Sequence, residues 1–220
     1  MPDIFDEAQR DYQAEQVQRA LRRYGWIPVT LFVLVLAGVG GWKYWQARQL
    51  KRDMAMAEQF LPVTDQADKL VGGDKAGRIA AAEKLVTLAG HAPVGYRTLA
   101  RLRAAGLYAD AGQLTQAQAQ WDQVIDDPAA DPLLRQVASL VWVMRSLDSA
   151  DPNGLRVRLL TQTAADDPFH NLAFELQALL DLRLGQVSAA RALLSRLMAD
   201  PDLPSGQRAR DGAILTVLGS

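Results

Sequence analysis

Between Arg23 and Lys43 the chain has 19 consecutive residues without a charged side chain. Because an α-helix rises about 1.5 Å per residue, this stretch would form about 28 Å of helix, close to the ~30 Å hydrocarbon core of a bilayer. Aromatic residues flank both of its ends, where amphipathic rings prefer the headgroup region. These residues are Tyr24, Trp26, Trp42, Tyr44 and Trp45. The pattern predicts a transmembrane helix over residues 24–45, with Pro28 in its first turn, where a missing N–H costs least.

A buried helix and a cleaved signal peptide both fit this apolar segment less well. A buried helix of a soluble protein is rarely apolar on every face for five turns. A cleaved signal peptide needs an apolar core of only about 7–15 residues, with a small-residue cleavage site close behind it. The candidate site at Ala55-Met56-Ala57 lies beyond four basic residues. An uncleaved signal anchor fits better, and Ala37 and Gly41 would let a second membrane helix approach closely.

Charge alone does not orient the segment, because four basic residues stand on each side of it. They are Arg10, Arg19, Arg22 and Arg23 before it, and Lys43, Arg48, Lys51 and Arg52 after it. Short loops count more than long domains, which favours a cytoplasmic tail and a C-terminal domain outside the cytoplasm. The tail, residues 1–23, has an amphipathic helical pattern and would rest on the lipid interface or on a docking partner.

From residue 46 to residue 220 the pattern is helical, with turn residues about every 15–20 positions. Asp or Asn before Pro starts a helix by capping it, and Gly ends one. The breaks fall at residues 72–74, 90–93, 112–113, 126–128, 151–154, 166–168, 185–186 and 200–201. The chain is therefore predicted to be all-α, with a stack of helical hairpins in this region.

Similar residues recur at a fixed spacing within the stack. Ala105, Tyr108, Gly112, Ala117, Trp121 and Pro128 are each followed 73 residues later by Ala178, Asp181, Gly185, Ala190, Leu194 and Pro201. A second series, Pro132, Pro168 and Pro204, is spaced by 36 residues. Seventy-three is close to two units of 36, and solenoids built from helix pairs have this period.

These residues resemble the tetratricopeptide repeat. Small residues such as Ala117 and Ala190 suit the point where two helices cross, and Gly112 and Gly185 suit a left-handed turn. Trp121 and Leu194 would fill the space between hairpins, while Pro128 and Pro201 would stop the second helix. The repeats are degenerate: Asp181 replaces the expected aromatic residue, and the unit over residues 131–167 matches mainly in spacing. A non-repetitive helical bundle is the alternative.

The layout of the whole chain resembles the ancillary Sec-translocon subunit family. The resemblance is carried by Asp3-Ile4-Phe5, Arg22-Arg23-Tyr24-Gly25, Gly40-Gly41-Trp42-Lys43-Tyr44-Trp45, Arg208-Ala209, Leu215 and Leu218-Gly219. It implies a single-pass protein of the bacterial inner membrane, with a cytoplasmic tail and a periplasmic repeat domain. The partners that it implies are the Sec translocon and membrane-anchored periplasmic chaperones.

Composition and charge argue against nucleic-acid binding, thiol chemistry and metal binding as functions of this chain. With 24 Lys and Arg against 25 Asp and Glu, the formal net charge is -1, which gives no overall basis for nucleic-acid binding. The chain has no cysteine, so disulfides and thiolate chemistry are excluded. His91 and His170 are too far apart in sequence for a metal-binding pair. Asp126-Asp127 and Asp166-Asp167 precede prolines and are interpreted as helix caps.

We therefore expect no enzyme activity, cofactor or metal, and a non-enzymatic adaptor that binds proteins through the repeat domain. A scaffold subunit of another cell-envelope complex, for division or secretion, is the alternative. An enzyme hidden in the helical domain would depend on a residue such as Asp127 or His170. The sequence assigns no residue of the repeat domain to partner binding.

Overall fold

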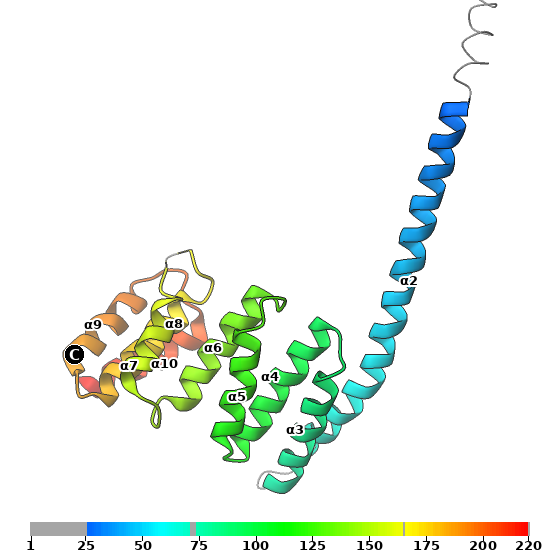
Figure 1. The fold of residues 1–220 in the computed structure, drawn as a ribbon. Helices are drawn as coiled ribbons and strands as arrows, with labels where there is room; N and C mark the ends of the chain where they lie inside the picture. Colours follow the sequence, from blue (N-terminus) through cyan, green and yellow to red (C-terminus); the bar gives the residue numbers. More distant parts are fainter. Residues whose placement is uncertain (1–25, 71–73, 165, 220) are drawn as a thin grey trace, which may run out of the picture. The chain divides into compact units, whose positions relative to one another are not determined.

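The computed structural model describes residues 26–70, 74–164 and 166–219, with the side chains of residues 26–41, 47, 49, 52 and 53 left out (Figure 1). All regular structure in these ranges is helical. The helices are α2 (Trp26–Asp68), α3 (Lys75–Ala89), α4 (Val94–Asp110), α5 (Leu114–Ile125), α6 (Pro132–Ser146), α7 (Pro152–Leu160), α8 (His170–Arg183), α9 (Val187–Met198) and α10 (Ser205–Leu218).

The chain divides into two compact units, Met1–Ala55 and Met56–Ser220. In the first unit, the described side chains lie on α2. Trp42 and Trp45 are 66% and 58% exposed, and their ring centroids are 6.1 Å apart. The guanidinium of Arg48 lies 5.4 Å from the centre of the Tyr44 ring.

The expected fold class is wrong in its transmembrane helix. Among the residues that the structure describes, no helix combines the length and the apolar character needed to span a bilayer. The helix does not end at Trp45, since α2 continues to Asp68, and from Trp42 onward it carries exposed charged residues such as Lys43 and Lys51. Residues 1–23 and Tyr24 lie outside the described residues, as do the side chains of Trp26, Pro28, Ala37 and Gly41.

The second unit is a series of helical hairpins, as the sequence predicts. Phe60 and Val63 in the second half of α2 pack against the same apolar core as α3. The next pairs are α4 with α5, α6 with α7 and α8 with α9, and α10 packs against α9 (Figure 1). The turns of the α4–α5 and α8–α9 hairpins have the same backbone conformation. Gly112 and Gly185 adopt φ values of 82° and 73°, and the N–H of the residue after each donates to a carbonyl five residues back, at 2.8 Å. These glycines allow the left-handed conformation that reverses the chain.

The middle hairpin, α6 with α7, turns without a left-handed glycine. Its loop is held from the next hairpin, because Arg183 of α8 donates to the carbonyl oxygens of Leu147 and Ala150. The N–H of Ala150 also donates to the carbonyl of Ser146 at 2.9 Å. This substitute for the glycine turn explains why the sequence of the middle unit matches the repeat pattern only in spacing.

Aspartates mark the helix boundaries in two ways. Asp131 and Asp151, each before a proline, cap α6 and α7 by accepting from the N–H groups of Leu133 and Gly154 at 2.8 Å, as expected. The interpretation of Asp127 and Asp167 as helix caps is wrong, because neither they nor Asp200 cap the following helix. Each accepts from the N–H two residues later and from a side chain near the start of the hairpin's first helix. These side-chain donors are Arg97, Gln136 and Asn171.

The residues of the repeat pattern lie between the helices. Ala117 and Ala190 are 0% exposed, and Trp121 and Leu194 are buried beside them in the first and third apolar clusters. Tyr108 is buried, whereas Pro128 and Pro201 are exposed just after the ends of α5 and α9. Asp181, which replaces the aromatic residue, is also buried and accepts from Arg156 of α7 at 2.9 Å.

Ion pairs join successive hairpins at the spacing of the repeat. Asp68 with Arg103, Asp122 with Arg158, and Glu175 with Arg210 are separated by 35, 36 and 35 residues. The Glu175 carboxylate accepts two bonds from Arg210, at 3.0 and 2.9 Å. The sequence period therefore corresponds to the step from one hairpin to the next.

Candidate functional site

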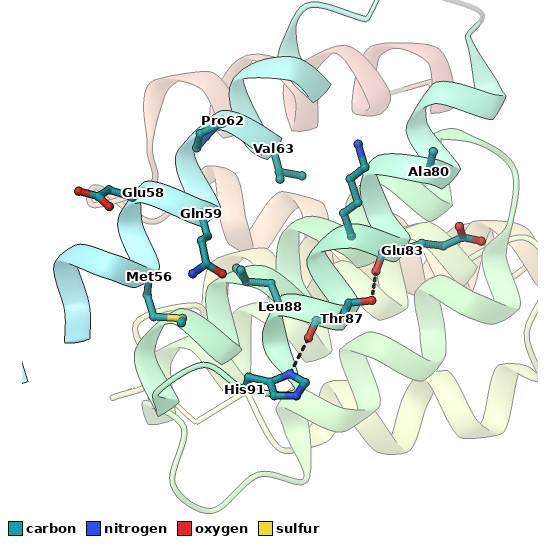
Figure 2. A pocket seen from close by; sticks show the side chains of 11 residues that line it. Met56, Glu58, Gln59, Pro62, Val63, Ala80, Glu83, Thr87, Leu88 and His91 are labelled. Carbon is teal, nitrogen blue, oxygen red and sulfur yellow. Dashed lines mark hydrogen bonds between the residues drawn. The ribbon is translucent and has the colours of Figure 1, made fainter. Parts of the chain in front are cut away.

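A groove with a volume of about 700 Å³ lies between the second half of α2 and α3 (Figure 2). Every residue that lines it belongs to the second unit. The lining residues are Met56, Glu58, Gln59, Pro62, Val63, Ala80, Glu83, Lys84, Thr87, Leu88 and His91. On each helix these positions recur at steps of one to three residues, which places them along one broad face.

The groove exists because other faces of the two helices pack into the core. On α3 the buried residues are mostly alanines, and Leu85 among them is 0% exposed. On α2, Phe60 packs edge-on against Tyr96 of α4, with ring centroids 6.0 Å apart. Asp68 at the end of α2 pairs with Arg103 of α4. Both helices are thus fixed by contacts outside the groove, which stays open between them.

The floor of the groove is apolar, with polar groups along its edges. Val63 and Leu88 are partly buried and also pack against the core. Glu58, Gln59, Glu83 and Thr87 are exposed. Figure 2 shows Glu58 and Glu83 at opposite sides of the site. The arrangement suits contact with an apolar surface that has polar groups on both sides.

Hydrogen bonds within α3 fix part of one wall. The Thr87 hydroxyl donates to the carbonyl of Glu83 at 2.9 Å, and Nδ1 of His91 lies 3.3 Å from the carbonyl of Thr87 (Figure 2). Glu83 also acts on the neighbouring hairpin, because burial and then the Glu83 charge raise the pKa of the Tyr108 phenol.

The opposite wall contains a proline inside a helix. Pro62 lies within α2 and has no backbone N–H, so it cannot bond to the carbonyl of Glu58 four residues earlier. The Thr64 hydroxyl donates to the carbonyl of Leu61 at 2.9 Å.

The residues that could act in catalysis do not converge. Asp127 lies after α5, where a hydrogen bond from Arg97, helped by the N–H of Ala129, lowers the pKa of its carboxyl group. His170 begins α8, and its Nδ1 lies 2.7 Å from the carbonyl of Asp167. Within residues 26–70, 74–164 and 166–219, no group of three or more His, Cys, Asp and Glu side chains could hold a metal ion.

Two smaller hollows lie among the later helices. One, of about 200 Å³, is lined by residues of α8 and α9 that include His170, Phe174 and Arg196. The guanidinium of Arg196 covers the Phe174 ring at 5.0 Å from its centre. The other, of about 270 Å³, lies beside Arg135 and Ser139 of α6. Both are much smaller than the groove between α2 and α3.

A buried carboxyl group near the C-terminus was not predicted from the sequence. Asp211 of α10 is 0% exposed, and neither of its carboxyl oxygens has a hydrogen-bond partner. Burial, and then the negative charge of Glu175, raise the pKa of Asp211 from 3.8 to about 6, although Arg210 and Gln207 act in the opposite direction.

Of the groove residues, only His91 stands out in the sequence, and there as a histidine next to a helix start. The remaining residues are common surface types, and their position in one groove depends on how α2 is held against α4. Pro62 inside a long helix is the one local signal that could have drawn attention to this wall.

Comparison with known protein families gives a match over most of the chain. The model of a family described as "Tetratricopeptide repeat-like domain" matches residues 18–192. No curated protein and no solved structure matches significantly.

Proposed function

Because the chain belongs to the tetratricopeptide repeat-like domain family, we propose that it is a non-enzymatic adaptor that binds protein partners through its helical repeats. The observation that carries this proposal is the open groove of about 700 Å³ in the first hairpin. Repeat solenoids use their extended surfaces to recognise peptides or folded domains. A groove with an apolar floor and polar edges suits such a surface.

We propose further that the partners are the Sec translocon and membrane-anchored periplasmic chaperones, and that the repeat domain works in the periplasm. The support is the resemblance of the chain's layout to the ancillary translocon subunits, for example in Gly40–Trp45 and Arg22–Gly25. A scaffold in a division or secretion complex is the alternative. The identity of the bound proteins distinguishes these functions.

Site-directed photo-crosslinking of the full chain in cells tests the adaptor function. A photoreactive residue at Gln59, which is exposed in the groove, should give a defined covalent product with another protein. The same residue at Asp148, exposed in the loop between α6 and α7, is the control. The adaptor function would be contradicted if no protein were crosslinked either from Gln59 or from any of the exposed positions tested on α4, α6 and α8.

Mass spectrometry of the crosslinked product tests the partners, and reporter fusions test the compartment. Translocon or chaperone components are expected, whereas division or secretion components would favour the alternative scaffold. A reporter active only outside the cytoplasm should give signal when fused after Ser220 and none when fused before Met1. The opposite result would rule out the periplasmic repeat domain.

A further inference from the structure

We infer that the groove between α2 and α3 receives an amphipathic helix of a partner protein, with lysine or arginine side chains beside its apolar face. This inference rests on the proposed function, because it names the kind of segment that the adaptor binds. It depends on the structure of the groove's walls, on its size and on the charges along its edges.

Both walls of the groove are α-helices, and this limits how a peptide can bind. An extended peptide gains affinity by adding a strand to a sheet edge, and residues 26–70, 74–164 and 166–219 contain no strand. A proline-rich peptide needs a groove lined by aromatic rings, and none of the lining residues is Phe, Tyr or Trp. A helix satisfies its own backbone hydrogen bonds and needs only a surface for its apolar side chains.

The size of the groove fits the side chains of a helix rather than a whole helix. Its volume of about 700 Å³ lies within the range of about 300–1,000 Å³ for pockets that enclose small ligands. A few apolar side chains at steps of three and four residues would fill that space. Met56, Val63 and Leu88 supply the apolar contacts, and Figure 2 shows them on facing walls.

The edges of the groove favour a basic partner. Glu58 and Glu83 each carry a carboxylate, while Lys84 is the lone Lys or Arg among the lining residues. Lysine and arginine side chains carry only donors and match this excess of acceptors. An acidic helix would meet the same carboxylates with repulsion.

Model peptides test the inference on the full-length chain. One labelled peptide of about 18 residues has leucines on one helical face and lysines elsewhere. A second has glutamates in place of the lysines, and a third has alanines in place of the leucines. Fluorescence anisotropy at fixed ionic strength should show the first peptide binding at least about tenfold more tightly than the other two, since exposed charge pairs each contribute up to about fivefold.

Two variants localise the binding. Thr87→Trp adds a large side chain at an exposed lining position and should weaken the leucine–lysine peptide at least about tenfold, because a filled groove excludes the leucines. E58K/E83K reverses both edge charges and should reverse the preference between the lysine and glutamate peptides. The control D148K/D166K makes the same charge change at exposed sites away from the groove and should leave the preference unchanged. Circular dichroism checks that each variant is folded.

Equal affinity for the lysine and glutamate peptides would overturn the inference. It would also be overturned if Thr87→Trp bound the first peptide normally, or if E58K/E83K kept the original preference. If a crosslinked partner binds the Thr87→Trp variant with the same affinity as the unmodified chain, the groove is not its binding site, but the adaptor function still stands. Peptide results as expected, with no protein crosslinked in cells, would instead contradict the adaptor function.

Discussion

Asp211 gives a sharp test of the packing of α10, because a buried carboxylate whose pKa is raised destabilises the fold above that pKa. The pKa of Asp211 is raised from 3.8 to about 6, first by burial and then by the charge of Glu175. A shift of about two pKa units corresponds to at most about 3 kcal/mol between the two protonation states. Asp211→Asn removes the charge while keeping the shape of the side chain. It should therefore raise the free energy of unfolding by about 1–3 kcal/mol at pH 7.5.

The pH dependence is the decisive part of this prediction. Because the folded-state pKa lies above 3.8, the native protein takes up the proton first as the pH falls. The penalty for the charge is present above about pH 6 and disappears between about pH 6 and pH 4. The gain from Asp211→Asn should vanish over the same range, whereas Asp148→Asn, at an exposed site, should show no such trend.

Urea unfolding followed by circular dichroism between pH 4 and pH 8 measures this difference. Hydrogen exchange over residues 205–219 shows whether the gain is local to α10, as expected for repeats that contact mainly their neighbours. A gain that does not depend on pH, or a loss of stability at pH 7.5, would show that the carboxylate of Asp211 is satisfied in the folded protein. The reasoning from its burial would then be refuted.

Three further predictions concern the hairpins. Gly112→Ala should lower the free energy of unfolding by about 1–2 kcal/mol in thermal unfolding, because φ is 82° at this residue. The control Gly106→Ala, which has open space around its new Cβ, should raise it by up to about 1 kcal/mol. Equal effects of the two substitutions would contradict the left-handed turn at Gly112. Trp121→Ala should cost about 3–5 kcal/mol in urea unfolding, because it empties a buried site, and a loss below about 1 kcal/mol would contradict its role in the core. Arg97→Ala should destabilise the fold at pH 7, because Arg97 lowers the pKa of the Asp127 carboxyl group. This destabilisation should disappear as the pH falls below about 4 and the carboxylate becomes protonated. A destabilisation that is constant with pH, measured by urea unfolding, would refute the pairing of Arg97 with Asp127.

The parts of the fold that were predictable depend on local rules. Gly112 and Gly185 stand out because few residues other than glycine adopt a left-handed turn, and Asp131 and Asp151 stand out because an aspartate before proline caps a helix. The 36-residue period follows from the spacing of prolines. The apolar run before Lys43 also follows a local rule, but the expected transmembrane helix is contradicted, because no described helix is both long and apolar enough to span a bilayer.

The candidate site was not predictable in the same way, because it depends on contacts between elements. The groove stays open because Phe60 packs on Tyr96 and Asp68 pairs with Arg103, and neither contact can be read from one helix alone. The turn of the middle hairpin likewise depends on Arg183, which lies 36 residues from Leu147. Such long-range pairs become predictable only when the period is used to align the hairpins.

Aligning the hairpins by the 36-residue period places the two buried carboxyl groups, Glu175 and Asp211, at equivalent positions. Ser139, Glu175 and Asp211 are spaced by 36 residues and occupy the same position on α6, α8 and α10, where their exposures are 8%, 5% and 0%. Glu175 tolerates its burial because Arg210 reaches it from the following helix, α10. At Asp211, Arg210 and Gln207 lower the pKa, but burial and the charge of Glu175 outweigh them and raise it to about 6. The same position in the repeat therefore holds a carboxylate paired with Arg210 on α8 and a buried carboxyl group with a raised pKa on α10.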